Sequence, residues 1–193
     1  MIIRKLFKFE NAHIVRNCSS SRCRSSLHGH SYKVEVLFES NFLDNGQMVY
    51  DFGLMKQNIK DLIDAFDHAV TIWDKDDAKY TADMKKHSQR WVVLPVSPSA
   101  EQFSRVIFIL IDALMRLTKT INGEKEVKLH SIIVHETATG YAQCFREDAY
   151  SEIMGIICLD NIIFSNEVIN AWNDRELFKK IKAKKAFINE TSV

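Results

Sequence analysis

The residues of this chain best suited to chemistry are three histidines near its start: His13, His28 and His30. His28 and His30 stand two apart at the start of a strand-like run, and strand side chains alternate between faces, so both imidazoles should share one face. His13 ends an apolar stretch that begins at Ile2, and it joins them if the two strands pair. Three neutral imidazoles with an open fourth position are typical of catalytic zinc, because structural zinc sites usually have four protein ligands.

Cys23 precedes this histidine pair, with four residues between it and His28. A thiol beside a metal site is a candidate general base or nucleophile. To act as a base, Cys23 would need a thiolate stabilised by nearby positive charge, which zinc, Arg22 or Arg24 could supply. The alternatives are a small buried hydrophobic residue or a disulfide with Cys18, and Cys18 also competes for the catalytic role because it lies in the same loop.

The elements that must position these residues begin with two strands. Residues 2–9 and 31–39 are expected to be strands on either side of a polar loop at 16–27, which is rich in Cys, Ser and Arg. A tight turn is expected at 44–46, where the sequence is Asp-Asn-Gly.

A first helix is expected to begin at an Asp51 N-cap and to run to about residue 66. Its apolar face would consist of Phe52, Met55, Ile59, Leu62, Ile63 and Phe66. The mixed stretch at 67–97 is expected to be a long loop, and long loops in compact domains are more often functional than idle.

Ser99 and Gln102 have the spacing of a capping box, which predicts a second helix that ends near residue 121 at an Asn-Gly pair. Two further apolar stretches, at 127–135 and 141–146, are separated by a short connection and predict a hairpin. The order is therefore β-β-α-α-β-β. This order predicts an α+β domain over 1–147, with two helices packed on one face of an antiparallel sheet.

The remaining segment, 148–193, is expected to be a helical C-terminal extension, with N-caps at Ser165 and Asp174. Its last helix would be amphipathic, with a solvated basic face and the apolar residues Leu177, Phe178, Ile181 and Phe187. The basic residues are Lys179, Lys180, Lys182, Lys184 and Lys185. We prefer this amphipathic interpretation to a phosphate-binding role.

The composition is that of an ordinary globular chain of 193 residues, with 46% hydrophobic residues and 26 Lys and Arg against 25 Asp and Glu. This balance disfavours a general nucleic-acid binder. No segment approaches the roughly 18–20 apolar residues that span a bilayer. The first residues indicate a strand rather than a signal peptide, so we expect a cytoplasmic protein whose four cysteines are mostly reduced.

Six short motifs occur in an order that resembles the 6-pyruvoyl-tetrahydropterin synthase family, whose bacterial branch includes the 6-carboxy-tetrahydropterin synthases of the queuosine pathway. The motifs are Phe9–His13, Cys23 with His28–His30, Met48–Phe52, Asp67-His68, Pro98–Glu101 and His135–Thr137. The resemblance covers 1–147. It implies a tunnelling fold (T-fold) in which subunits join their sheets into a barrel, as a homotrimer or homohexamer. It also implies zinc at the three histidines and 7,8-dihydroneopterin triphosphate as substrate.

The resemblance also implies roles for acid–base residues. Cys23 would move protons on one face of the substrate, and Asp67 would orient His68 to relay a proton on the other. The alternative for His68 is a histidine favoured by the dipole at a helix C-terminus. The following residues, 69–73, depart from the family's usual Leu-Asn-rich continuation, which leaves the path of this loop open.

Glu136 stands at the end of an apolar strand, where a carboxylate is costly to bury unless it finds hydrogen-bond donors. A pterin ring offers an N–H and an amino group side by side, which suits one carboxylate. The alternative is an outward-pointing glutamate. The resemblance adds Thr137, Ser99 and Glu101 to the ring-binding set, although a glutamate in a first helical turn is favoured anyway.

Three functions are considered. Resemblance to bacterial members favours a zinc-dependent lyase that forms 6-carboxytetrahydropterin. The second is 6-pyruvoyl-tetrahydropterin synthase, which uses the same scaffold and metal, so the motifs do not separate the two. The third is a catalytically silent zinc-binding regulatory protein, and the presence of Cys23 and Asp67-His68 argues against it.

Overall fold

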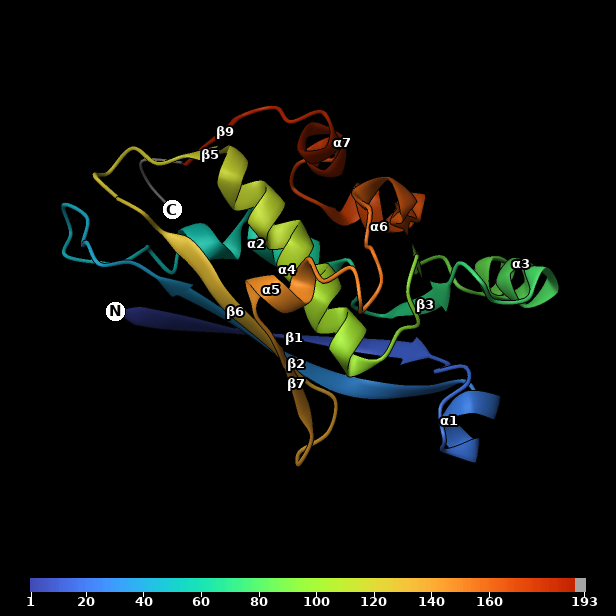
Figure 1. The fold of residues 1–193 in the computed structure, drawn as a ribbon. Coiled ribbons are helices and arrows are strands. Elements are labelled where there is room, and N and C mark those ends of the chain that lie inside the picture. Colours follow the sequence, from blue (N-terminus) through green and yellow to red (C-terminus); the bar gives the residue numbers. More distant parts are fainter. Residues whose placement is uncertain (190–193) are drawn as a thin grey trace.

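The computed structural model describes residues 1–189, and the end of the predicted extension, 190–193, lies outside the described residues. A seven-stranded sheet of order β7-β6-β2-β1-β3-β4-β8 runs through the molecule. Figure 1 shows α2, α4, α6 and α7 on one side of this sheet, while the described part of the chain leaves its other side uncovered. Among the described residues no helix is long and apolar enough to cross a membrane.

Two long strands form the centre of the sheet. β1 (Ile2–His13) and β2 (His28–Glu39) are antiparallel and pair without interruption from Ile2 opposite Glu39 to His13 opposite His28. Both strands therefore extend further than predicted and include the histidines themselves. Because side chains alternate, Phe9 and Tyr32 point to the helix side and are buried.

The predicted hairpin is confirmed. β6 (Lys128–His135) and β7 (Tyr141–Cys144) are antiparallel to each other, and β6 also pairs with β2. α4 (Ala100–Leu117) packs across these strands. Its predicted start is confirmed, because the Ser99 side chain accepts a hydrogen bond from the Gln102 backbone N–H. The helix ends earlier than predicted, and β5 (Thr118–Lys119) follows it directly.

The expectation of a long loop at 67–97 is wrong. This segment contains β3 (Ala69–Trp73), α3 (Ala78–His87) and β4 (Trp91–Leu94). β3 runs parallel to β1, and β4 runs parallel to β3, so the α+β class holds while the sheet is mixed rather than antiparallel. Strands this short have too few residues to display a reliable periodicity. The partner of β3 on β1 is also distant in sequence.

The first helix is also shorter than predicted. A 3-10 turn, η1 (Leu54–Lys56), precedes α2 (Asn58–Asp64), and the backbone of Gln57 between them is not helical, with φ −102° and ψ −117°. Asp51 does not cap α2. Its carboxylate instead accepts from the Gly53 N–H at 2.6 Å, which forms a local turn.

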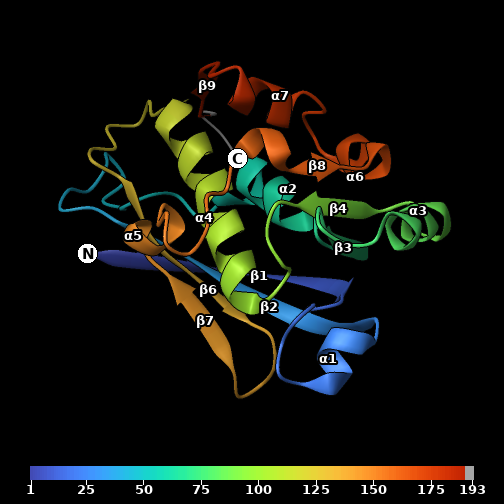
Figure 2. The same ribbon diagram turned by 45° about the vertical axis from the view of Figure 1, so that its right-hand side comes forward.

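The chain after β7 contains strands as well as helices. Its elements are α5 (Arg146–Ala149), η2 (Leu159–Asn161), β8 (Ile163–Phe164), α6 (Asn166–Ala171), α7 (Leu177–Lys182) and β9 (Phe187–Ile188). β8 pairs with β4 of the main sheet, and β9 pairs with β5. Figure 2 shows α6 and α7 beside α2 and α4.

The predicted caps of the last two helices had different outcomes. The Ser165 hydroxyl caps α6 by accepting from the Val168 N–H, as predicted. Asp174 does not cap α7, because α7 begins at Leu177 and the cap position belongs to Glu176. The amphipathic prediction for α7 is confirmed. Its buried residues are Leu177, Phe178 and Ile181. The helix is shorter than predicted, because it ends at Lys182 and Phe187 belongs to β9.

A buried arginine on α4 fixes the segment that follows α5. Arg105 is 3% exposed and has no carboxylate partner in the described structure. Its guanidinium donates to five backbone carbonyls, those of Asp148, Ala149, Ser151, Met154 and Gly155. A buried cation is costly unless its donors are satisfied, so this one side chain holds the path of the segment.

Candidate metal centre and its cavity

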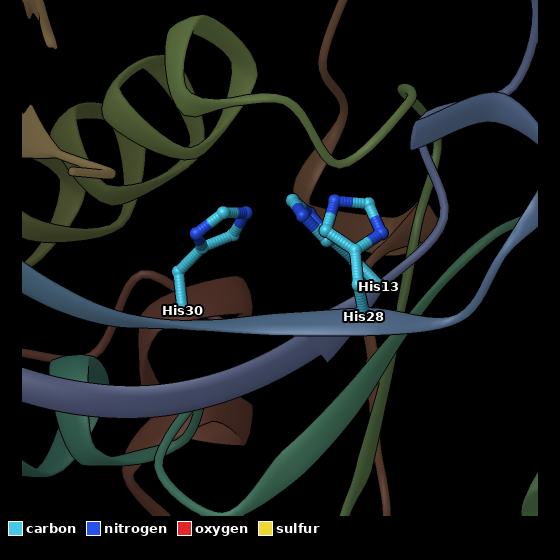
Figure 3. Close-up of side chains that lie close together, drawn as sticks. All are labelled: His13, His28 and His30. Carbon is cyan, nitrogen blue, oxygen red and sulfur yellow. The ribbon is translucent and has the colours of Figure 1, made fainter. Parts of the chain in front are cut away.

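The pairing of β1 with β2 brings the three histidines together. His13 lies directly opposite His28, and Asn11 lies opposite His30, so the three imidazoles share the helix-facing side of the sheet. Figure 3 shows the rings rising from the same face of the two strands. One ring nitrogen from each residue lies within 4.8 Å of the others. The three residues form a metal-binding group.

Gly29 lets the two strands approach closely at this point. A Cβ atom at this position would lie 2.9 Å from the Asn11 carbonyl oxygen, closer than such atoms tolerate. The His-Gly-His pattern therefore has a structural reason. Any side chain between the two histidines would push β2 away from β1.

Backbone carbonyls orient two of the rings. The Nδ1 of His13 lies 2.5 Å from the Pro98 carbonyl oxygen, and the Nδ1 of His28 lies 2.9 Å from that of Ser26. A carbonyl can only accept, so each Nδ1 carries the hydrogen and each Nε2 keeps a lone pair. Burial lowers the pKa of His13 to about 4, which keeps this ring neutral at ordinary pH. These features fit a bound metal ion.

The metal-binding group opens into a cavity of about 520 Å³. The predicted site residues that line it are Cys23, His28, His30, Ser99, Glu101, Glu136 and Thr137. They come from the short helix before β2, the start of β2, the N-terminus of α4 and the turn that follows β6. The structure therefore brings these predicted residues together around one cavity.

The structure does not separate the two candidate thiols, because Cys18 lines the same cavity as Cys23. Both cysteines are free. Cys23 lies in α1 (Ser21–Ser25), a short helix within the predicted loop, and its carbonyl accepts from the Val15 N–H at 3.1 Å. This bond ties the helix back to the end of β1.

Glu136 stands beside the histidines. Its Oε1 lies 3.9 Å from the Nε2 of His13 and 4.0 Å from that of His30. The Tyr32 hydroxyl donates to the same oxygen at 3.1 Å. Burial, and then the negative charge of Glu136, raise the pKa of Tyr32 well above its usual value, so the phenol stays protonated.

Tyr32 is the residue that sequence reasoning missed. Its position two residues after His30 was the available signal, because that spacing places it on the same face of β2. A tyrosine inside a strand is equally typical of a core residue, so sequence alone gave no reason to single it out.

Asp67 and His68 are paired but do not line this cavity. The His68 Nδ1 lies 2.8 Å from an Asp67 carboxylate oxygen, and the other oxygen accepts from the Glu10 N–H at 2.8 Å. His68 lines a separate hollow of about 330 Å³ with Glu10 and Ser31. Its φ of +51° is unusual for a residue with a side chain, and such conformations occur often at functional sites.

Comparison with known proteins identifies a family that matches most of this chain. The sequence model of 6-pyruvoyl tetrahydropterin synthase matches residues 2–147. The chain belongs to this family. The resemblance inferred from the six motifs is thereby confirmed.

Two relatives carry a more specific name. A 6-carboxy-5,6,7,8-tetrahydropterin synthase from Helicobacter pylori (strain J99) is 38% identical over 182 residues, which are 94% of this chain and 91% of the relative. One from Aquifex aeolicus is 31% identical over 159 residues, covering 73% of this chain and 95% of the relative. The Helicobacter match therefore continues well beyond residue 147, where the motif resemblance ended.

Solved structures agree on the fold. An uncharacterized protein from Wolinella succinogenes matches with a TM-score of 0.63 and 24% identity, over 76% of this chain and 98% of that one. A Plasmodium vivax 6-pyruvoyltetrahydropterin synthase matches with a TM-score of 0.50 and 18% identity, over 76% and 98% of the two chains. The mixed α+β architecture is that of the T-fold family.

Proposed function

We propose that this chain is a 6-carboxy-5,6,7,8-tetrahydropterin synthase, a lyase that converts 7,8-dihydroneopterin triphosphate to 6-carboxytetrahydropterin, acetaldehyde and triphosphate in queuosine biosynthesis. The observation that carries the proposal is the 38% identity to the Helicobacter synthase across nearly the whole of both chains. The open cavity beside three metal-binding histidines supports it.

The metal of the proposed enzyme is zinc, held by His13, His28 and His30. Three imidazoles with room for a further ligand suit a catalytic zinc ion, and the two carbonyl-bonded rings present the nitrogens that such an ion requires. When bound, zinc would act as a Lewis acid toward oxygens of the substrate side chain.

The protein's own residues would bind the ring and move protons. Glu136 would accept hydrogen bonds from the pterin N–H and amino group, with Thr137, Ser99 and Glu101 completing the ring pocket. Cys23 would serve as the general base at the side chain. All of these residues line the cavity, which supports the assignment.

Asp67 and His68 would complete proton transfer from a second copy of the chain. One chain leaves this pair outside the cavity, with the His68 side chain 75% exposed. Among residues 1–189 the sheet also ends in the unpaired edges of β7 and β8, and proteins usually cover or pair such edges. We therefore propose a homotrimer or homohexamer in which 1–147 forms the synthase domain and 148–193 an extension of it.

The second candidate is 6-pyruvoyl-tetrahydropterin synthase, the activity that the matching family description carries. It eliminates triphosphate and keeps the side chain. Mass spectrometry of the products from purified protein with 7,8-dihydroneopterin triphosphate separates the two. Formation of 6-carboxytetrahydropterin and acetaldehyde is expected. A retained pyruvoyl side chain would favour the second candidate, and unchanged substrate would contradict both.

A further inference from the structure

The core fixes the position of the Tyr32 hydroxyl. Tyr32 is 1% exposed, and its ring stacks on that of Phe9 with centroids 4.8 Å apart. The Phe103 ring from α4 packs against it at 5.3 Å. Phe9 and Phe103 also contact each other, with centroids 5.8 Å apart, so the phenol is packed against a pair of adjacent buried rings. This close packing restricts the ring and makes its hydroxyl a positioned hydrogen-bond donor.

Glu136 is the strongest partner available to this hydroxyl. The two ring nitrogens of His13 lie 3.4 and 3.5 Å from it, at the edge of hydrogen-bond distance. The hydrogen on His13 Nδ1 is already directed at the Pro98 carbonyl. The Tyr32 hydrogen therefore goes to the Glu136 carboxylate, 3.1 Å away.

The bonded oxygen is the one nearest to the metal-binding nitrogens. Two ligands of a tetrahedral zinc ion, each bonded at about 2.0–2.1 Å, lie about 3.3 Å apart. Glu136 Oε1 lies 3.9 and 4.0 Å from two of the imidazole nitrogens, just beyond that separation. Because carboxylates are ordinary zinc ligands, a small rotation would let Glu136 bind the metal and close the position that a substrate needs.

We propose that Tyr32 is a positioning residue that keeps the Glu136 carboxylate out of the metal's ligand set and available to the pterin ring. This inference rests on the proposed function, since it assumes both a metal and a ring at the site. The hydrogen bond engages Oε1, the oxygen that would otherwise reach the metal. Glu136 can then act on the ring while the metal keeps an open position.

The test removes only the hydroxyl, in a Tyr32→Phe variant that retains the aromatic packing. Cobalt(II) replaces the native metal, because its visible spectrum responds to the number and type of ligands. In Tyr32→Phe we expect the cobalt spectrum to change as Glu136 becomes a ligand. In the Tyr32→Phe/Glu136→Gln double variant, where the carboxylate is absent, we expect the spectrum of the Glu136→Gln single variant.

A second measurement is calorimetric titration with sepiapterin, a pterin that lacks the triphosphate. In the cobalt-loaded Tyr32→Phe protein, sepiapterin affinity should fall roughly tenfold, the scale of a lost hydrogen bond to a charged group. In the metal-free protein the loss should be clearly smaller, because no metal competes for the carboxylate. This dependence on metal separates positioning from a merely structural role.

Tyr50→Phe is the matched control. Tyr50 is also buried, and its hydroxyl donates to Asn189 at 3.2 Å, away from the metal-binding group. It should match wild type in both measurements. An unchanged cobalt spectrum in Tyr32→Phe, or an equal loss of sepiapterin affinity with and without metal, would overturn the inference. If wild-type protein binds neither cobalt nor sepiapterin, the proposed function is wrong and the inference falls with it.

Discussion

The three-histidine centre on β1 and β2 and the Asp67–His68 pair before β3 differ in how much of their surroundings one chain supplies. The side chain of His13 is fully buried, and its ring is oriented by a backbone carbonyl of the same chain. His68 is largely exposed and lines a different hollow. One folded chain therefore assembles the metal-binding group, whereas the proposed proton transfer by His68 would need a neighbouring chain.

The largest expected effect is loss of the metal. The His28→Ala/His30→Ala variant removes two of three imidazoles, so it should lose both bound zinc and turnover while remaining folded. Metal analysis after dialysis, with circular dichroism as the check on folding, measures this. His68→Ala is the matched control and should keep its full zinc content. Full zinc occupancy in the double variant would contradict the ligand assignment.

Replacement of the proposed base should have the next largest effect. Cys23→Ala leaves the ring pocket and the metal ligands intact, so sepiapterin should still bind while turnover falls by ~10² or more, the scale of a lost general base. Initial rates with the triphosphate substrate measure this fall.

Cys18→Ala is the control for that experiment and should retain most of the turnover. The two thiols line the same cavity, so this control tests the choice between them. If Cys18→Ala loses as much turnover as Cys23→Ala while keeping its zinc, the base is Cys18.

Mixed oligomers of two inactive variants test whether His68 acts across a subunit boundary. Cys23→Ala and His68→Ala each remove one proposed proton-transfer group. If the groups act together across a subunit boundary, oligomers reassembled from both variants will contain some intact sites and recover part of the activity. Sedimentation should show a trimer or hexamer throughout. A fully active monomer, or no recovery in a mixed oligomer, would contradict the shared site.

The smallest expected effect concerns acid stability of the metal-free protein. Burial lowers the pKa of His13 in the folded protein to about 4, from a usual value of 6.5. Between these two pH values His13 is therefore protonated in the unfolded chain but neutral in the folded one. The unfolded state thus binds more protons in that window, so stability falls as the pH drops through it and is unaffected above it. The loss should approach ~3 kcal/mol at the acid end.

Urea denaturation of metal-free protein across this pH range measures the effect. A His13→Gln variant should show a flatter pH dependence, because the titrating ring is gone. An equal slope in both proteins would show that other groups cause the acid sensitivity.

Local signals in the sequence account for what could be predicted. The period of two in strands places His28 and His30 on one face, and the Ser99 cap marks the start of α4. Residues whose placement depends on distant partners could not be predicted. β3 owes its position to pairing with β1, and the same pairing carries His68 to a hollow away from the metal-binding group.

Tyr32 illustrates the same limit at the level of one side chain. Its hydroxyl matters because Glu136, 104 positions later, directly follows β6 and lies within hydrogen-bond distance of it. Strand alternation accounts for the face on which its ring lies, but the register of β6 against β2 decides which residue its hydroxyl contacts. Such a contact is a property of the assembled sheet.

The close approach of β1 and β2 at Gly29 has a consequence for protein engineering. The spacing of the imidazoles follows from two backbones in contact, so repacking of neighbouring side chains would hardly alter it. An attempt to fit a different metal would do better to alter the carbonyls of Pro98 and Ser26, which set the rotation of two rings. Both carbonyls belong to loops, where insertions and deletions are tolerated best.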